Sequence, residues 1–308
     1  MARLGERAGM VGLAAFLVVD VLLVAFAISS TRHPVDQGGT TIDPGVVATS
    51  APKTTKTAAA PATPSVKVVP LTRGLVAFDK DTAFRFTTGS CKSGGSKLEL
   101  TRNGGESWGP RSVPYDTIVR VRVRPDGSAF VVGADSETEC TPAIRQTGAL
   151  DADFGDSAVV ADAWFRDPRA ATTVGVPSGG TTKPCGSGQV VDLAVIDSGA
   201  AALCSDGRLR ESTSGESWAT SATVEGALAL ALTAKARTFV VVPGVDSCEG
   251  LAVVDTAKPT KAVGCAAADV AKVKPGTVAL SVTSGGGWLG VDDTVYLAGG
   301  NLATWKQG

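Results

Sequence analysis

From Leu71 to the end of the sequence, short apolar runs alternate with turn-forming residues, and this pattern most restricts the fold. The runs are rich in Val, Ala, Leu and Phe, and Gly, Asp, Ser and Pro separate them. No stretch shows the sustained 3.6-residue apolar period of a helix, so we expect an all-β domain. Turn signals such as Pro125-Asp126-Gly127 are typical of hairpins. The clearest expected strands are residues 74–78, 83–87, 97–101, 118–124, 128–133, 190–196, 200–204, 228–232, 238–242, 251–255, 278–282 and 294–298.

A weak internal repeat runs through the same region. Phe84, Phe130 and Phe239 each follow a small residue and begin a short strand that leads to a cysteine, at intervals of 46 and 109 residues. A period of about 45 to 55 residues predicts a β-propeller of four-stranded blades, because single blades bury both faces only by packing in a closed ring. Counting hairpins gives about six blades. Five and seven are the alternatives, because the irregular stretch at 164–184 is either a blade or a long insertion.

Two segments share a hairpin motif. Residues 101–108 read TRNGGESW, and residues 211–218 read ESTSGESW, which keeps the Gly, Ser and Trp but has Glu and Thr at the first and third positions. A third remnant at 298–305 keeps little beyond its final Thr and Trp. The side chains that fit the motif are Thr101, Asn103, Gly105, Ser107 and Trp108 in the first copy and Gly215, Ser217 and Trp218 in the second. We expect a structural role, with the Asn bonding its own turn, the Gly at positive φ and the Trp buried between blades.

These copies resemble the Asp-box, or BNR repeat, of pattern S/T-x-D/N-x-G-x-S/T-W. Residues 66–308 therefore resemble the Asp-box β-propeller superfamily, which includes sialidases and the non-enzymatic photosystem-assembly-factor propellers. In that superfamily the box marks the fold and lies away from the active face, so the resemblance implies a fold and leaves function open. With the N-terminal segment described next, the chain resembles a membrane-anchored bacterial type of such a propeller.

Residues 8–28 are an apolar run of 21 residues, or about 31 Å of helix, which matches the hydrocarbon thickness of a bilayer. Asp20 near its centre costs about 2.5–3.5 kcal/mol, but twelve Val, Leu, Ile and Phe residues return about 0.3–0.6 kcal/mol each, so we expect a transmembrane signal anchor. Basic residues precede it, so residues 1–7 are predicted to be a cytoplasmic tail of a single-pass cell-membrane protein. A signal peptide cleaved after Ala27 is the alternative, because residues 25–27 form an A-x-A-like site.

Residues 29–65 are predicted to be a disordered linker between this anchor and an extracytoplasmic domain, residues 66–308. In residues 48–65 all but two side chains belong to Ala, Thr, Ser or Pro, which cannot bury enough surface to offset chain entropy. The first 65 residues hold five of the 29 basic and four of the 30 acidic side chains, leaving 24 against 26. A domain with this balance is not expected to bind nucleic acid through its overall charge.

The cysteines and the single histidine limit the chemistry. His33 lies in the linker, so a His-dependent nucleophile, base or zinc site is excluded from the domain. An even number of cysteines outside the cell predicts three disulfides, with fifteen connectivities open to sequence alone. We favour sequential pairing, which closes short loops between neighbouring strands. The six cysteines are Cys91, Cys140, Cys185, Cys204, Cys248 and Cys265. No cofactor and no metal site are expected.

Arg120, Arg122 and Arg124 alternate with valines and are the candidate binding residues. On a strand their side chains project from one face, which suits contact with an anion or a polyanion. The alternative is a solvated edge-strand face that discourages strand addition, with the residues tolerant of substitution. Residues 165–168, FRDP, resemble the F/Y-R-I-P motif of sialidases but lie mid-domain and carry Asp in place of Ile, so we interpret Arg166 as an ordinary loop residue.

The sequence therefore leaves two hypotheses for the function. The first is a membrane-tethered, non-catalytic propeller that binds a protein or an envelope polymer such as a glycan on its loop face or in its central channel. The second is a glycan-active hydrolase of the sialidase-like type that uses paired carboxylates in the channel. We favour the first, because no catalytic constellation is visible in the sequence.

Overall fold

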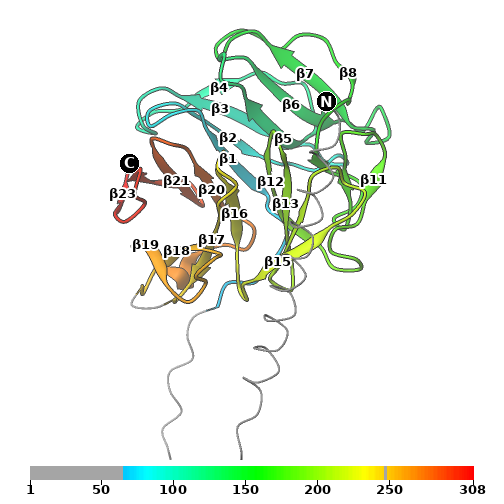
Figure 1. The fold of residues 1–308 in the computed structure, drawn as a ribbon. Helices are drawn as coiled ribbons and strands as arrows, with labels where there is room; N and C mark the ends of the chain where they lie inside the picture. The colour runs from blue at the N-terminus through cyan, green and yellow to red at the C-terminus, as the bar shows by residue number, and fades with distance from the viewer. Residues whose placement is uncertain (1–64, 246–247) are drawn as a thin grey trace, which may run out of the picture. The chain divides into compact units, whose positions relative to one another are not determined.

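The computed structural model describes residues 65–245 and 248–308, which fold into six antiparallel sheets arranged as propeller blades (Figure 1). Each sheet comes from one continuous segment of chain, and its first strand lies nearest the axis. These inner strands contact one another in order around the ring, and the last contacts the first. The inner strands are β1 (Arg73–Ala77), β5 (Thr117–Val123), β9 (Phe165–Arg166), β12 (Val190–Ile196), β16 (Ala229–Leu232) and β20 (Val278–Val282). The prediction of an all-β propeller with six blades is confirmed.

The other strands extend each blade outward from the axis. Blades 1 and 2 continue with β2 (Ala83–Thr87), β3 (Lys97–Thr101) and β4 (Gly109–Arg111), and with β6 (Ala129–Ala134), β7 (Ala143–Thr147) and β8 (Ala158–Val159). Blades 3 and 4 continue with β10 (Val174–Gly175) and β11 (Thr181–Thr182), and with β13 (Gly199–Cys204), β14 (Arg208–Ser212) and β15 (Ala219–Thr223). Blades 5 and 6 continue with β17 (Thr238–Pro243), β18 (Leu251–Asp255) and β19 (Ala262–Ala266), and with β21 (Gly286–Val291), β22 (Thr294–Gly299) and β23 (Trp305–Gln307). A 3-10 helix, η1 (Val270–Lys272), lies in the loop between these last two blades.

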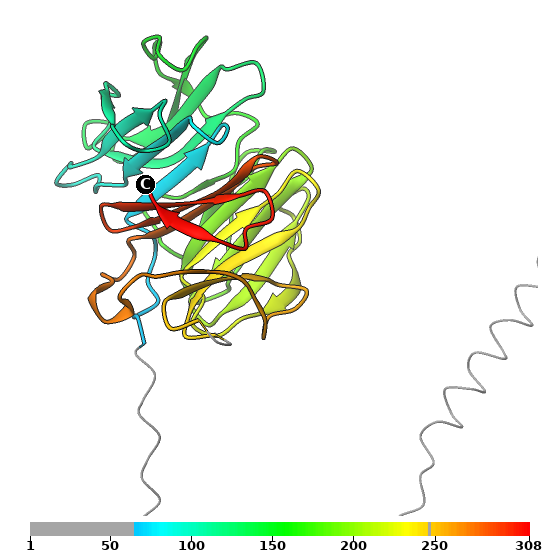
Figure 2. The same ribbon diagram turned by 90° about the vertical axis from the view of Figure 1, so that its left-hand side faces the viewer.

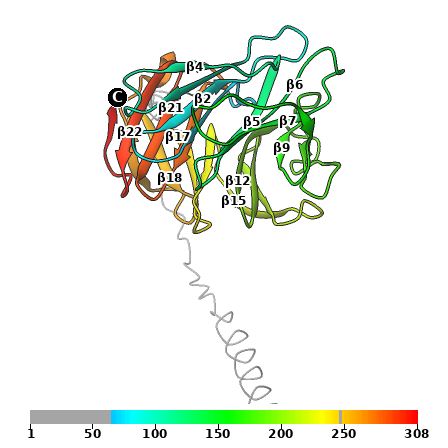
Figure 3. The ribbon, with the colours of Figure 1, turned by 90° about the horizontal axis from the view of Figure 1, so that it is seen from above.

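Blade 3 corrects the expectation of four strands in every blade. It has three strands of two residues each, and it falls in the irregular stretch that the sequence left open between a blade and an insertion. Strands this short contain no full apolar alternation, so pattern analysis cannot find them. Its consequence for the site is that the inner strand β9 is far shorter than its neighbours β5 and β12, which lie beside it (Figure 3).

Apolar packing between blades holds the ring together. The second strands β6 and β13 are buried along their whole length, because each lies between two neighbouring blades and both of its faces are covered. Six clusters of buried apolar side chains occur, one at each interface between adjacent blades. The largest joins blades 5 and 6, and the smallest joins blades 6 and 1. Stability is therefore distributed around the ring, and the seam where the ring closes has the fewest fully buried apolar side chains.

Blades 6 and 1 lie side by side (Figure 2), and side chains of both blades meet at the seam between them. Every strand of blades 1 and 6 pairs within its own contiguous segment, so no strand is exchanged across the seam. The Arg73 guanidinium donates to the carboxylate of Asp293 at 2.6 Å. The indole Nε1 of Trp288 donates to the backbone carbonyl of Asp79 at 2.9 Å. Trp288 also meets Trp108 edge to face, with ring centroids 6.3 Å apart.

The predicted anchor at 8–28, the cytoplasmic tail and the linker up to residue 64 lie outside the described residues. Within residues 65–245 and 248–308, no helix has the length and apolar character needed to cross a membrane.

Candidate functional site

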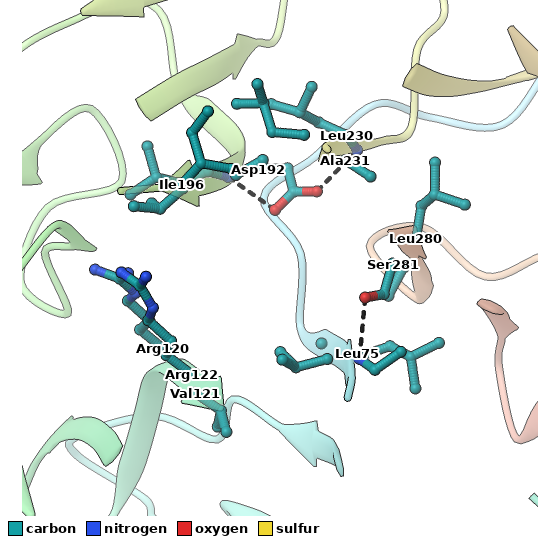
Figure 4. A pocket seen from close by; sticks show the side chains of 18 of the residues that line it. Leu75, Arg120, Val121, Arg122, Asp192, Ile196, Leu230, Ala231, Leu280 and Ser281 are labelled. Atoms are coloured by element: carbon teal, nitrogen blue, oxygen red, sulfur yellow. Dashed lines mark hydrogen bonds between the residues drawn. The ribbon is translucent and has the colours of Figure 1, made fainter. Parts of the chain in front are cut away.

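The candidate site is the central channel of the propeller, a cavity of about 510 Å³. All six inner strands or the residues next to them line it, and most of these lining residues are aliphatic. Figure 4 shows this wall with Leu75, Ile196, Leu230 and Leu280 around the space. The volume lies within the range typical of small-ligand sites, about 300–1,000 Å³. The charged side chains that line it are Arg73, Arg120, Arg122, Arg166, Asp192 and Asp197.

One end of the channel is closed by the chain itself. The segment before β1 crosses this end, where the backbone N–H of Leu71 donates to the carbonyl of Val191 at 2.9 Å. The N–H of Thr72 donates to the carbonyl of Gly276, just before blade 6, at 2.8 Å. Arg166 donates to the carbonyl of Leu71 at 2.8 Å and to that of Val191 at 3.2 Å. The channel is therefore a blind pocket, and the interpretation of Arg166 as an ordinary loop residue was wrong.

The open mouth of the channel lies at the other end. It is bordered by Pro125, Ser198 and Ala234, which belong to turns between the first and second strands of their blades. In an antiparallel meander the turns between the third and fourth strands lie on the same face as the turns between the first and second. In blade 1 these two turns contact each other, because the N–H of Gly104 donates to the carbonyl of Asp81 at 2.9 Å. The open mouth and the Asp-box turns therefore share one face, whereas the resemblance implied that the boxes lie away from the active face.

Asp192 is a channel carboxylate that the sequence analysis missed. Its oxygens accept backbone N–H groups from Leu193 at 2.7 Å and from Leu230 at 2.9 Å (Figure 4). Burial raises the pKa of Asp192, although the charge of Arg166 and the two backbone donors act in the opposite direction. The signal was present in the sequence, because an isolated acid within the apolar strand 190–196 must find partners when it is buried.

Arg120 is one of the least exposed charged side chains, at 9%. One of its terminal nitrogens donates to the backbone carbonyl of Trp164, the residue before β9. Its guanidinium also lies over the ring of Phe130, at 5.1 Å from the centroid. Burial, followed by the charge of Arg122, lowers the pKa of Arg120 to about 9, so the group remains charged at neutral pH. The expectation of a solvated, substitution-tolerant position is wrong for this residue.

Arg122 bridges two blades across the shortened blade 3. It forms an ion pair with Asp197, which lies in the turn after β12 in blade 4. Because β9 contains only two residues, no strand of blade 3 separates the upper parts of β5 and β12, and the Arg122 side chain fills this gap. Asp197 is 90% exposed, so solvent screens the pair and it adds little stability.

Arg124, the residue after the end of β5, continues the alternation of Arg120 and Arg122 but is not part of the channel wall. Its guanidinium lies over the ring of Phe130, at 5.2 Å from the centroid. It also donates to the amide oxygen of Gln146 at 3.3 Å. In the sheet of blade 2, Arg120 lies opposite Val132 and Arg122 lies opposite Phe130. Val132 and Phe130 both pack against blade 3, so the arginine side chains are on the face of the sheet that points to blade 3. That face is directed at the neighbouring blade, and only Arg120 and Arg122 reach the cavity.

The first copy of the hairpin motif, residues 101–108, forms a hydrogen-bonded turn between β3 and β4. Thr101 Oγ1 donates to Asn103 Oδ1 at 2.8 Å and accepts from the N–H of Gly105 at 3.0 Å. Asn103 Oδ1 also accepts from the N–H of Ser107 at 3.1 Å. Gly105 has a φ of 88°, which a glycine adopts without strain. Trp108 is half-buried at the seam against Trp288, rather than fully buried as the sequence analysis expected.

The second copy of the motif, residues 211–218, forms a variant of this turn between β14 and β15. Ser212 supplies the hydroxyl that accepts from the N–H of Gly215 at 2.8 Å, in place of the Glu that precedes it. Gly215 has a φ of 90°. Trp218 is also half-buried and packs edge to face on Trp164 of blade 3, with centroids 5.5 Å apart. Ser217 is exposed. Both tryptophans therefore lie between blades, away from the channel wall.

Three disulfides brace the propeller outside the channel. They join Cys91 to Cys140, Cys185 to Cys204, and Cys248 to Cys265, which is the sequential pairing predicted from the sequence. The first links blades 1 and 2. The second links blade 4 to the loop that enters it from blade 3, and the third lies within blade 5.

The carboxylates of the channel do not form a glycosidase pair. Asp192 and Asp197 are the acidic residues in the wall, and they lie five residues apart on one extended segment, or about 16 Å at about 3.3 Å per residue. Retaining and inverting glycosidases place their carboxyl groups about 5 to 9.5 Å apart. Neither Tyr115 nor Tyr296 borders the cavity, so the described wall offers no tyrosine nucleophile of the sialidase kind.

The sequence matches no family model and no curated protein. Solved structures that resemble the fold include YCF48 bound to D1 peptide, at 16% identity and a TM-score of 0.38, covering 78% of this chain and 82% of that chain. The WD40 propeller domain of Doa1 matches at 12% identity and a TM-score of 0.42, covering 76% and 80%. PorZ of Porphyromonas gingivalis matches at 11% identity and a TM-score of 0.41, covering 79% of this chain and 33% of that one. At these TM-scores the likeness carries no inference about function.

Proposed function

We propose that this protein is a non-catalytic binding module that receives part of its partner in the mouth of the propeller channel. The observation that carries the proposal is a blind cavity of about 510 Å³ whose lining is mostly aliphatic residues and includes four arginines and two aspartates. Concave apolar sites with a few oriented polar groups are typical of ligand binding. The carboxylate spacing gives no support to the alternative, a glycan-active hydrolase.

We further propose that the module is held outside the cell membrane. The apolar run at 8–28 and the Ala/Thr/Pro/Ser linker at 29–65 support an anchored, extracytoplasmic location, and the disulfides are typical of an oxidising compartment. The partner would then be a protein or an envelope polymer.

Site-specific photo-crosslinking in intact cells tests this proposal. A photo-reactive residue replaces Ser198, which borders the mouth, and in a matched control replaces Ser221, which is exposed on the outer strand β15. We expect a discrete adduct from the mouth position and none from the control. Adducts of equal yield from both positions, or none from either, would count against binding at the mouth.

A turnover assay addresses the hydrolase. Fluorogenic sialosides and other glycosides are incubated with the purified full-length protein and with an Asp192→Asn variant. We expect no release of fluorophore above buffer from either protein. Release by the wild type that the substitution abolishes would favour the hydrolase over the binding module.

A further inference from the structure

The guanidinium of Arg120 has more donors than the protein uses. It carries five N–H donors, and the described residues provide one acceptor, the carbonyl of Trp164. The side chain is nine-tenths buried, and Arg120 is one of the residues that line the channel. A buried charge without a paired counter-ion is costly, which makes this position one where an external anion gains binding energy.

The neighbouring charges leave this position positive. Arg122 lies two residues along the same strand, about 6.6 Å away at about 3.3 Å per residue, and its guanidinium points the same way as that of Arg120 (Figure 4). Asp197 balances one of these two charges from an exposed position at the mouth. At the floor, Asp192 already accepts two backbone donors, and Arg166 already donates to two carbonyls. The unbalanced charge is therefore at mid-depth, on blade 2.

The rest of the wall restricts what can accompany an anion. The residues that line the cavity opposite blade 2 are mostly aliphatic and include Ile196, Leu230 and Leu280 (Figure 4). Ser198 and Ser281 are the hydroxyl side chains among the residues that line the cavity, and Ser281 already accepts the backbone N–H of Ala77 at 3.0 Å. A sugar acid would bring several hydroxyls and find few side-chain partners for them among the residues that line the cavity, which weakens its binding. An apolar stem meets no such penalty.

We propose that the channel binds a carboxylate carried on an apolar stem, with Arg120 and Arg122 holding the carboxylate and the aliphatic walls holding the stem. This proposal rests on the binding function proposed above and names its ligand chemistry. A carboxylate suits the site because a guanidinium donates to it through two parallel hydrogen bonds. Two sources share this chemistry, a free apolar carboxylic acid and the C-terminal residue of a polypeptide with an apolar side chain.

Asp197 allows a binding role of Arg122 to be distinguished from a purely structural one. Its carboxylate pairs with Arg122 at the mouth and therefore competes with any carboxylate that enters. Removing its charge should free Arg122 and tighten ligand binding. If the Arg122–Asp197 pair only braced the two blades, its loss would leave affinity for a carboxylate unchanged.

The test compares hexanoate with hexanamide, which differ in charge but share the same stem, by isothermal titration of the full-length protein. We expect hexanamide to bind at least about tenfold more weakly, a difference of about 1.4 kcal/mol. Arg122→Gln should weaken hexanoate by about tenfold, and Asp197→Asn should tighten it by about threefold, because both change one charge next to the carboxylate. Arg124→Gln is the matched control, since this residue continues the alternation of Arg120 and Arg122 but lies outside the cavity wall, and hexanoate affinity should stay within about twofold.

Two further probes distinguish the sources and the rival chemistry. A tripeptide ending in Leu should bind as tightly as hexanoate or more tightly, and lose affinity when its C-terminus is amidated, if the ligand is a chain end. Preference for hexanoate over the peptide acid would identify a free acid. Glucuronate that binds more tightly than hexanoate would overturn the apolar stem.

Equal binding of hexanoate and hexanamide, or equal weakening by the Arg122 and Arg124 substitutions, would overturn the proposal. Arg120 is left unchanged in these variants, because its buried hydrogen bond makes misfolding a complication, and circular dichroism checks that the exposed-site variants are folded. A discrete crosslink from position 198 together with no binding of carboxylates would retain the binding module and reject this ligand class. Loss of both would reject the proposed function itself.

Discussion

Replacing Trp288 with Ala should destabilise this propeller more than replacing Trp108, its partner across the seam. Trp288 is 1% exposed at the seam of blades 6 and 1, where the apolar cluster is the smallest of the six. Large-to-small changes of buried aromatic residues cost about 3–5 kcal/mol, and the lost hydrogen bond to the Asp79 carbonyl adds about 1 kcal/mol. We therefore expect a loss of about 4–6 kcal/mol. Trp108 is half-buried, so Trp108→Ala should cost about half as much, about 2–3 kcal/mol.

Urea unfolding followed by far-UV circular dichroism measures both losses without relying on tryptophan fluorescence. The double variant provides the control, because the two rings meet edge to face and such pairs contribute about 0.5–1.5 kcal/mol. The double variant should thus lose less than the sum of the single losses by about this amount. An equal cost for the two single substitutions, or strict additivity, would refute the assignment of Trp288 as the residue that closes the ring.

The other expected outcomes concern a turn, the disulfides and a buried acid. Gly215→Ala should lower the free energy of unfolding by more than Gly127→Ala, as measured by urea titration. Both glycines have positive φ. An added Cβ at Gly215 would lie 2.4 Å from Val176 Cγ1, whereas one at Gly127 would meet nothing within 4 Å. Reducing the three disulfides should lower the melting temperature, since each contributes about 2–4 kcal/mol, and a reductant-insensitive melt would contradict this. Burial raises the pKa of Asp192, so its folded form holds a proton that the unfolded form releases as pH rises above about 4. The wild type should therefore gain stability relative to Asp192→Asn as pH falls from 7 toward 4, and a pH-independent difference would contradict the raised pKa.

Much of the fold could be predicted from the sequence because strand and turn signals are local. The six blades, the disulfide pairing and the turn geometry of residues 101–108 all follow from patterns within about 50 residues. The strands of blade 3 could not be predicted from such local patterns. Its two-residue strands are held by packing against blades 2 and 4, with Trp164 and Phe165 buried, and no local period records that packing.

The candidate site was predictable only in part, for a related reason. Alternation placed Arg120 and Arg122 on one strand face, but it could not show that this face is directed at a shortened blade and a cavity. The positions of Arg166 and Asp192 depend on how inner strands from different blades meet around the axis. For Asp192 the local signal is a lone charge inside an apolar run, since burial obliges such a group to find partners, whereas Arg166 stands beside Asp167 and carries no such signal.

The floor of the channel has a consequence for where this domain begins. All six sheets lie between Arg73 and Gln307, so a boundary drawn at the first strand would keep every blade. Such a truncated chain would nevertheless lack Leu71 and Thr72, whose backbone N–H groups bond to Val191 and Gly276. Val66, which packs between blades 5 and 6, would also be lost. The result would be a tunnel open to water at both ends, with Arg166 and Asp192 hydrated, and a ligand could pass through it without being retained.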